Sequence, residues 1–268
     1  MTSIVIWAGV DSHGPSSLYM AADSRITWGS NNSTWDQGRK TFASQRFPDV
    51  ACLLGDVLFP LTAIAQFFEV LDSGLICLDD SAPEERFRAF EGRIRISLDS
   101  MSADRREAFT IFYGSRDGSL MKSTFRCWAV SWRKGAGEWT RVDLTIPSDS
   151  DVLRVDGSGK DHIERHIAQW RASSEGGTSR AVFSAFCDSL RVGQDPRSGG
   201  GPQLVGLYRK GTARSFGVVL DGRRFIAGFP VTWDVQPSEI EWRNELFERA
   251  DPETRRRMPG AQRHPRPE

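Results

Sequence analysis

Residues 1–25 read MTSIVIWAGVDSHGPSSLYMAADSR, with an apolar run on each side of a turn-rich connector. The runs at 4–10 and 18–23 predict an antiparallel pair of strands, because the Asp, Ser, Gly and Pro between them favour a turn. Thr2 stands directly before the first run, where removal of Met1 would expose its α-amine. An N-terminal threonine combines a nucleophilic hydroxyl with a basic amine, whose unperturbed pKa of about 7.7–8.0 leaves much of it neutral near physiological pH. This stretch therefore predicts a strand pair that begins at a candidate nucleophile.

Beyond this pair, short strands alternate with pairs of helices. Apolar residues at helical spacing predict the helices, and short apolar runs bounded by turn residues predict the strands. The expected elements, in chain order, are strands at 41–43 and 50–54, helices at 58–70 and 81–98, strands at 109–113, 120–132, 140–146 and 152–155, helices at 159–170 and 178–192, and strands at 203–208, 215–220 and 224–229. Two antiparallel sheets, each covered by a helix pair, would bury the apolar face of every block. We therefore predict an α+β fold, a four-layer αββα sandwich.

The chain divides into three regions by composition. Residues 1–230 carry the predicted strands and helices and form one expected domain. Residues 231–250 extend beyond it and are expected to include a short helix near 238–250. Residues 251–268 are rich in Arg, Pro and Gly, which predicts a disordered tail, with a basic interaction arm as the alternative.

Charge and cysteine pattern exclude several classes of protein. The 35 basic and 35 acidic residues cancel, so no overall field favours nucleic acid or an anionic membrane. No apolar run is long enough to span a bilayer, and no signal segment precedes the first strand. The cysteines (Cys52, Cys77, Cys127 and Cys187) are widely spaced, which is typical of reduced core thiols and not of a disulfide framework or a zinc site. We therefore expect a cytoplasmic protein without a cofactor or a metal.

Six short motifs follow one another along the chain. They are Thr2, Ala22-Asp23-Ser24-Arg25, Arg39-Lys40, Leu54-Gly55-Asp56, Gly157-Ser158-Gly159 and Asp195-Pro196-Arg197-Ser198-Gly199-Gly200. Each is common alone, but their joint order and approximate spacing resemble the proteasome β-type subunits and the bacterial heat-shock peptidase, which are N-terminal nucleophile (Ntn) hydrolases. The resemblance covers about residues 2–230, and the fold of that family is the αββα sandwich that the periodicity predicts.

The resemblance implies catalytic roles for three residues in the first part of the chain. Thr2 Oγ would be the nucleophile, and its α-amine would carry the proton through a water. Lys40 would be the buried active-site lysine, whose charge keeps the amine neutral and stabilises developing negative charge. Asp23 would pair with Lys40 and orient it. The alternatives are an aspartate that caps a turn and an ordinary surface lysine.

It also implies roles for four residues further along. The backbone N–H of Gly55 would form the oxyanion hole, where a glycine lets the reacting carbonyl approach the main chain. Ser158, Asp195 and Ser198 would hydrogen-bond the threonine amine and the water beside it. A helix N-cap and an ordinary loop are the alternatives for these three residues.

Two further patterns bear on specificity and on metal binding. Leu53 and Val57 flank Gly55 and predict an apolar rim, which would favour a hydrophobic residue before the scissile bond. His162 and His166 have the spacing of a metal pair on a helix, but the charged residues around them favour an exposed helix face. We therefore predict no metal site there.

Three functions are compatible with these residues. The resemblance implies a threonine-type peptidase that cleaves a peptide or an unfolded protein through an acyl-enzyme, after removal of Met1. It also implies a homo-oligomer, a ring or a smaller assembly, and an AAA+ ATPase partner, with no nucleic-acid or membrane partner. A catalytically silent ring subunit is one alternative, although such subunits generally lack the threonine and lysine present here. An Ntn amidase that acts on a small amide is the other.

Overall fold

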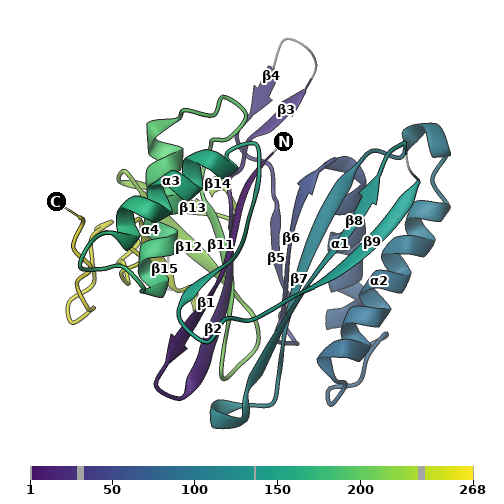
Figure 1. The fold of residues 1–268 in the computed structure, drawn as a ribbon, viewed down its shortest axis with the longest axis horizontal. Helices are drawn as coiled ribbons and strands as arrows, with labels where there is room; N and C mark the ends of the chain where they lie inside the picture. Colours follow the sequence, from purple (N-terminus) through teal and green to yellow (C-terminus); the bar gives the residue numbers. More distant parts are fainter. Residues whose placement is uncertain (1, 29–32, 136, 235–238, 268) are drawn as a thin grey trace.

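A sheet of eight strands contains the first strand of the chain. The structure, a computed structural model, describes residues 2–28, 33–135, 137–234 and 239–267 (Figure 1). The strand order is β10-β1-β2-β11-β12-β13-β14, and β15 also pairs with β12. The strands are β1 (Ser3–Asp11), β2 (Gly14–Ala22), β10 (Asp151–Gly157), β11 (Gln203–Tyr208), β12 (Arg214–Leu220), β13 (Arg223–Ile226), β14 (Phe229–Pro230) and β15 (Trp242–Asn244). Strands β12 and β15 pair in parallel, whereas all neighbouring strands in the order above are antiparallel.

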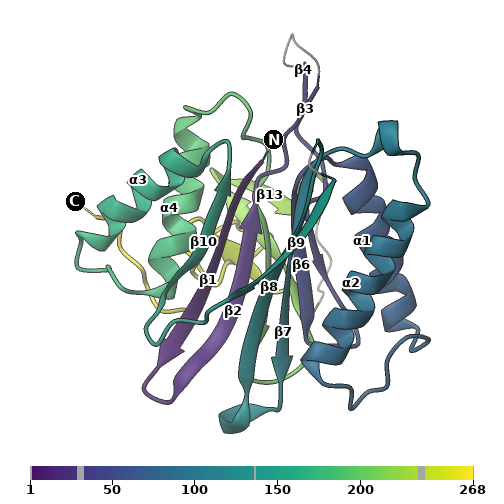
Figure 2. The ribbon, with the colours of Figure 1, turned by 45° about the vertical axis from the view of Figure 1, so that its right-hand side comes forward.

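The second sheet has five strands, in the order β5-β6-β7-β8-β9. They are β5 (Thr41–Ala43), β6 (Asp49–Gly55), β7 (Phe109–Asp117), β8 (Thr124–Arg133) and β9 (Glu138–Leu144). A separate hairpin of β3 (Ile26–Trp28) and β4 (Ser33–Trp35) projects from the body beside the N-terminus (Figures 1 and 2). This hairpin was not predicted, because three-residue strands carry too little apolar pattern to be recognised.

Four α-helices occur in the described part of the chain: α1 (Leu58–Asp72), α2 (Pro83–Asp99), α3 (Lys160–Arg171) and α4 (Ser179–Val192). Their ends follow from local chemistry. Pro83 opens α2, where its missing N–H is not needed. Thr178 caps α4 by accepting a hydrogen bond from the Ala181 N–H, and Gly193 ends that helix in the left-handed conformation. The α+β class and the two predicted helix pairs are therefore confirmed.

Three apolar clusters hold these elements together. One joins α3 and α4 to the eight-stranded sheet, with Trp7, Phe183 and Phe216 among its buried residues. A second joins α1 and α2 to the five-stranded sheet. The third contains residues from both sheets, such as Ile6 and Phe112, and so lies between them. Figure 2 shows the helix pairs on opposite sides of the two sheets.

The cysteines are free thiols, as predicted. Cys52, Cys127 and Cys187 are buried, and Cys77 is partly exposed. Burial raises the pKa of the Cys127 thiol to about 12, so this thiol stays protonated and unreactive. Among the helices described, none combines the length and the apolar character that a bilayer-spanning helix needs.

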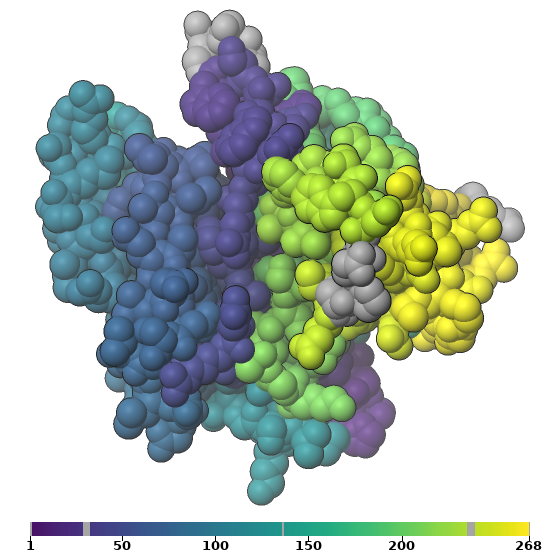
Figure 3. Space-filling view, turned by 180° about the vertical axis from the view of Figure 1, so that it is seen from behind, coloured from purple at the N-terminus to yellow at the C-terminus, as the bar shows by residue number. Residues whose placement is uncertain are grey.

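The C-terminal region differs from its prediction. Strand β15 forms where we expected a short helix, and the described residues 239–250 contain no helix. The reason is tertiary: β12 pairs with β11 only up to Phe216, so the edge that follows is open to β15. The segment expected to be a disordered tail also packs on the body, since His264 is buried and stacks on Trp170 with ring centroids 5.1 Å apart. Figure 3 shows this C-terminal segment, in yellow, lying against the preceding part of the chain.

Candidate active site around Thr2

Thr2 lies at the end of the eight-stranded sheet, between the ends of two neighbouring strands. Ser3 pairs with Gly157 on β10, and Ile4 pairs with Ala22 on β2. The Thr2 carbonyl accepts a hydrogen bond from the Ser158 N–H at 2.9 Å. The Thr2 side chain is buried, and its Oγ1 has no hydrogen-bond partner among the described residues. Buried polar groups usually have a hydrogen-bond partner, so an unpaired hydroxyl here calls for an explanation, of which a functional role is one.

Asp23 and Lys40 form a fully buried ion pair beside this strand end. Lys40 Nζ donates to Asp23 Oδ1 at 2.8 Å, and neither side chain is exposed to solvent. The same oxygen accepts the Ser3 N–H at 2.8 Å, so the pair is bonded to the residue after Thr2. Lys40 Nζ also donates to the carbonyl of Arg25 at 2.5 Å. Burial lowers the pKa of Lys40 although Asp23 works in the opposite direction, so its proton is held less tightly than that of a surface lysine.

The other oxygen of Asp23 connects the pair to the loop that contains Ser198. Asp23 Oδ2 accepts the Gly199 N–H at 3.0 Å and the Arg25 N–H at 3.1 Å. Asp23 thus accepts at least four hydrogen bonds, all from donors fixed by the backbone or by a buried side chain. Such bonds satisfy a buried carboxylate that would otherwise be costly to desolvate.

A second polar cluster surrounds Asp195. Ser158 Oγ and Ser198 Oγ both donate to Asp195 Oδ2, at 2.7 and 2.6 Å. The hydroxyls of Ser3 and Ser198 lie 2.6 Å apart, which extends the cluster to the residue next to Thr2. Partial burial works to raise the pKa of Asp195, but the hydrogen bonds from Ser198, Ser158 and the Arg197 N–H outweigh it and hold this pKa below its usual range. Asp195 is therefore ionised at neutral pH.

Gly55 belongs to the other sheet, at the end of β6. Its φ of +91° lies in the region that disfavours side chains, and a Cβ there would come within 2.5 Å of the Ala108 carbonyl oxygen. The Leu53 N–H donates to the Lys40 carbonyl at 3.1 Å, which ties this end of β6 to the segment that carries Lys40. Two hydrogen-bonded clusters thus connect the chain around Thr2, Asp23, Lys40, Ser158, Asp195 and Ser198. Among the described residues, Gly55 makes no hydrogen bond to any of these six and is tied to them only through β6.

Gln203, at the start of β11, is a site residue that the sequence analysis missed. Its buried amide oxygen accepts the Lys40 N–H at 2.9 Å, while its amide nitrogen donates to the carbonyls of Gly38 and Asp23 at 2.8 and 3.1 Å. One side chain thereby fixes the backbone at both members of the ion pair. The sequence offered one signal for Gln203, a single amide side chain at the start of an otherwise apolar strand. Ser3 was also not predicted as a site residue, because nothing in the sequence distinguishes it except its position next to Thr2.

A bidentate pair connects the projecting hairpin to the site. Arg25 donates to both carboxylate oxygens of Asp36, at 2.7 and 2.8 Å, and to the Pro196 carbonyl at 3.0 Å. On the hairpin, Trp28 and Trp35 stack with ring centroids 6.5 Å apart, and each is about half exposed. Arg25 therefore joins the base of the hairpin to the loop that carries Asp195 and Ser198.

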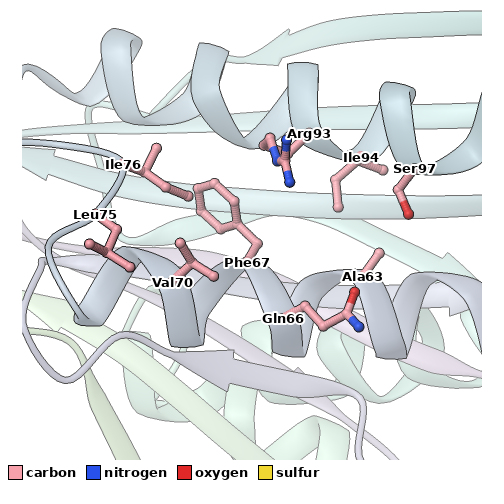
Figure 4. Close-up of a pocket in the computed structure, with 9 residues that line it drawn as sticks. All are labelled: Ala63, Gln66, Phe67, Val70, Leu75, Ile76, Arg93, Ile94 and Ser97. Atoms are coloured by element: carbon pink, nitrogen blue, oxygen red, sulfur yellow. The ribbon is translucent and has the colours of Figure 1, made fainter.

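Two cavities lie on different sides of the five-stranded sheet. One, of about 350 Å³, is lined by Leu54 and Gly55 from β6 and by residues of β7, β8, β9 and β10. The other, of about 340 Å³, lies between α1 and α2, where Phe67, Ile94 and Arg93 point into it (Figure 4). This second cavity shares no lining residue with the site around Thr2.

One of the two residues predicted to form an apolar rim around Gly55, Leu53, does not lie at a rim. The Leu53 side chain is fully buried in the core beneath α1 and α2, so it does not line a rim. Successive side chains of a strand point to opposite faces, and this places Leu54, not Leu53, at the cavity. In the described part of the chain, no group of three or more His, Cys, Asp or Glu residues is placed to hold a metal ion.

Comparison with solved structures relates the chain to a known fold. Anbu (ancestral beta-subunit) from Yersinia bercovieri is similar with a TM-score of 0.52 and 15% identity, over 79% of this chain and 86% of that one. Eukaryotic HslV from Trypanosoma brucei matches with a TM-score of 0.46 and 11% identity, over 76% of this chain and 99% of that one. The Anbu (Gly-1) mutant from Hyphomicrobium sp. strain MC1 matches with a TM-score of 0.48 and 13% identity, over 84% and 88%. No family model matches the sequence, and no curated protein matches it significantly. The likeness to the first structure shows a proteasome-like fold.

Proposed function

We propose that the chain is a threonine-type peptidase that hydrolyses peptide bonds through an acyl-enzyme on Thr2, after removal of Met1. The observation that carries the proposal is the buried Asp23–Lys40 pair, which is hydrogen-bonded to the backbone of Ser3, the residue next to Thr2. A buried ion pair adds little net stability compared with an apolar pair of similar size. Because the pair lies beside a potential N-terminal nucleophile, its charges could take part in the chemistry of that residue.

The proposed reaction has two steps. The hydroxyl of Thr2 attacks the substrate carbonyl while the free α-amine accepts its proton, and that proton then passes to the leaving amine as the peptide bond breaks. Water attacks the resulting ester, again with the amine as base, and releases the acid and Thr2. A positive charge on Lys40 disfavours the protonated amine and so keeps it available as a base.

The remaining site residues would position these groups. The cluster of Ser158, Ser198 and Asp195 would hold the amine and a water by hydrogen bonds, which an ionised Asp195 strengthens. The Gly55 N–H would donate to the oxyanion that forms on the substrate carbonyl, and the missing side chain would let that carbonyl approach. Gln203 and Ser3 would act as positioning residues for the ion pair and for the cluster.

The three apolar clusters support a four-layer αββα sandwich of the Ntn type, with residues 1–230 as the catalytic domain and 231–268 as an extension. We further propose that the protein is cytoplasmic, forms a homo-oligomer, and receives peptide or unfolded-protein substrates with the help of an AAA+ ATPase.

Intact-mass spectrometry tests the nucleophile directly. The protein is weighed before and after treatment with an epoxyketone, a reagent that bonds to both the hydroxyl and the amine of an N-terminal threonine. We expect the loss of Met1 and one adduct, which Thr2→Ala abolishes and Thr124→Ala, an exposed control, retains. A protein that keeps Met1 and forms no adduct would reject the proposal and favour a catalytically silent subunit.

A further inference from the structure

Five exposed arginines lie on two neighbouring turns of the chain. Arg249, Arg255, Arg256 and Arg257 belong to the turn at 249–257, and Arg223 opens β13 directly after the turn at 221–222. Within the described part of the chain, none of the five forms an ion pair. Their charges are therefore available to an anion from outside the chain.

Hydrogen bonds hold these arginines together as one surface, which we call the basic patch. The Asp251 N–H donates to the Arg256 carbonyl at 2.8 Å and closes the longer turn. Arg255 Nη1 donates to the Gly222 carbonyl at 3.2 Å, directly before Arg223, and so joins the two turns. Figure 3 shows the yellow residues of the longer turn next to the lime-green residues of β13 and β14. The five arginines thus concentrate positive charge in one place.

Few carboxylates offset this charge. Asp221 is already paired with Arg191 at 2.8 Å, and one oxygen of Asp251 accepts two backbone N–H groups of its own turn. Glu253 and Asp234 are exposed near the basic patch and carry the remaining negative charge. The patch therefore keeps an excess of positive charge.

The composition of the whole chain conceals this excess, because its 35 basic and 35 acidic residues cancel. The expectation that no overall field favours nucleic acid was drawn from that sum. At physiological salt, however, a charge acts over only about 8 Å, so a polyanion responds to the local patch and not to the total. The structure therefore reopens a class of ligand that the net charge disfavoured.

Two exposed aromatic side chains lie beside the basic patch. Phe229 and Trp233 are 49% and 58% exposed, and their ring centroids lie 6.2 Å apart. The buried Arg224 donates to the carbonyls of Trp233 and Pro252, at 2.6 and 3.1 Å, and so connects the aromatic pair to the longer turn. Exposed rings next to cationic groups offer faces on which a flat ligand can stack.

We infer that the basic patch and the Phe229–Trp233 pair form a binding site for single-stranded nucleic acid. The arginines bind the phosphates, to which a planar guanidinium can donate two hydrogen bonds, and the rings stack on unpaired bases. An acidic peptide would also satisfy the arginines, but it would leave the two rings without a stacking partner. The inference is independent of the proposed peptidase function, because it uses none of the candidate catalytic residues.

The salt dependence of binding tests the role of the arginines. A dye-labelled oligothymidylate of about 20 nucleotides is titrated with the full chain, and its fluorescence anisotropy is measured. About five phosphate contacts give a slope of about −3.5 for the logarithm of affinity against that of salt concentration, so affinity should fall about 100-fold between about 50 and 200 mM salt. No binding at the lower salt concentration, or a slope near zero, would overturn the inference.

Matched charge variants locate the site. Arg255→Ala/Arg256→Ala removes two phosphate contacts and should make the slope less steep by about 1.4. Arg88→Ala/Arg93→Ala removes two exposed arginines from α2, and it should leave both affinity and slope as in the wild type. Equal effects of the two double variants would show that binding follows total charge and would contradict a site in the basic patch.

A matched aromatic pair tests the stacking. Trp233→Ala should weaken binding about tenfold and leave the salt slope unchanged, because a ring contributes stacking and no charge. Trp28→Ala removes a ring of similar exposure, 52%, from the hairpin of β3 and β4 and should have no effect. If Trp233→Ala binds as tightly as the wild type, the rings take no part in binding and the inference fails.

Unlabelled competitors decide the class of ligand. Polyglutamate, inorganic polyphosphate and a DNA duplex are compared with the single strand at equal concentrations of charge. Each should displace the labelled strand less well, because the first two have no bases and the duplex holds its bases in a closed stack. Competition by polyglutamate as strong as that by the single strand would overturn the inference in favour of an acidic protein segment. Equal competition by polyphosphate or by the duplex would overturn it as well, since bases would then add nothing.

Discussion

At the scale of single residues, the site combines groups that are costly to bury with the bonds that offset this cost. The Asp23 carboxyl is accommodated at zero exposure because Lys40 and three backbone N–H groups are directed at it. Gln203 then fixes the backbone of both ion-pair members from a third segment. The pair is therefore held rigidly, which is what a catalytic group next to a nucleophile requires.

Removal of the lysine should lower both catalysis and stability, and a double variant should separate the two effects. Lys40→Ala leaves the buried Asp23 carboxyl without its counter-ion, so we expect loss of peptide turnover together with a fall of about 3–5 kcal/mol in the free energy of unfolding. The double variant Asp23→Asn/Lys40→Met replaces the charges by neutral groups of similar size. It should recover much of the stability and none of the turnover.

Urea unfolding and a peptidase assay measure the two effects. Lys122→Ala, at an exposed position, is the control and should behave as the wild type in both. If Lys40→Ala retains full turnover, the proposed role of the lysine is wrong.

At the scale of elements, β15 depends on a space that Gly217 leaves in β12. Gly217 pairs with Trp242, and a Cβ at position 217 would collide with the indole ring of Trp242. Trp242 in turn packs with Val219, Val231 and Ala250 in a small apolar cluster. The C-terminal extension is thus held on the sheet through one glycine and one tryptophan.

A side chain at Gly217 should therefore loosen the C-terminal extension. We expect Gly217→Ala to lower the free energy of unfolding by about 1–3 kcal/mol, the usual cost of overpacking a core. Gly92→Ala, in the interior of α2 with open space around it, is the matched control and should raise stability by about 0.5–1 kcal/mol. Thermal unfolding of the two variants beside the wild type makes the comparison. If Gly217→Ala unfolds at the same temperature as the wild type, β15 contributes little to the stability of the fold.

At the scale of the whole molecule, several large apolar side chains remain exposed around the first helix and the turn after it. Leu75 and Leu78, which are three residues apart in the segment between α1 and α2, are 80% and 74% exposed, and Leu58, at the other end of α1, is 73% exposed. Neighbouring exposed apolar groups such as Leu75 and Leu78 favour burial against another protein surface. They support the homo-oligomer proposed above.

Native mass spectrometry at micromolar concentration should therefore give a multiple of the protomer mass of 30.0 kDa. Burial of apolar surface drives such an association, so Leu75→Glu should shift the distribution towards the single protomer. Val192→Glu, on the far side of the molecule at the end of α4, should leave it unchanged. A wild type that stays at 30.0 kDa over this range would remove the homo-oligomer from the proposal.

Much of the fold could be predicted because its strands and helices carry strong local patterns. The apolar run that begins at Ile4, followed by a turn-rich connector, predicted a strand, and this run is buried from Ile4 to Gly9. Pro83, Thr178 and Gly193 mark helix ends by their own backbone chemistry. The strands at 26–28 and 33–35 were not predicted, and the strand at 242–244 was wrongly expected to be helical, because each of these strands is only three residues long. Their conformation is set by partners distant in the sequence, such as the open edge of β12.

The sequence by itself determined the class of fold and the candidate residues, since hydrophobic period, turn chemistry and the order of Thr2, Asp23, Lys40, Gly55, Ser158, Asp195 and Ser198 are all local or linear properties. Only the tertiary structure decided which groups meet. It directs Gln203 to the ion pair across about 160 residues of chain, joins Ser3 to Ser198, and turns Leu54 instead of Leu53 towards the cavity. The physical reason is that hydrogen bonds and burial depend on distance in space, and the pairing of strands far apart in the chain sets that distance.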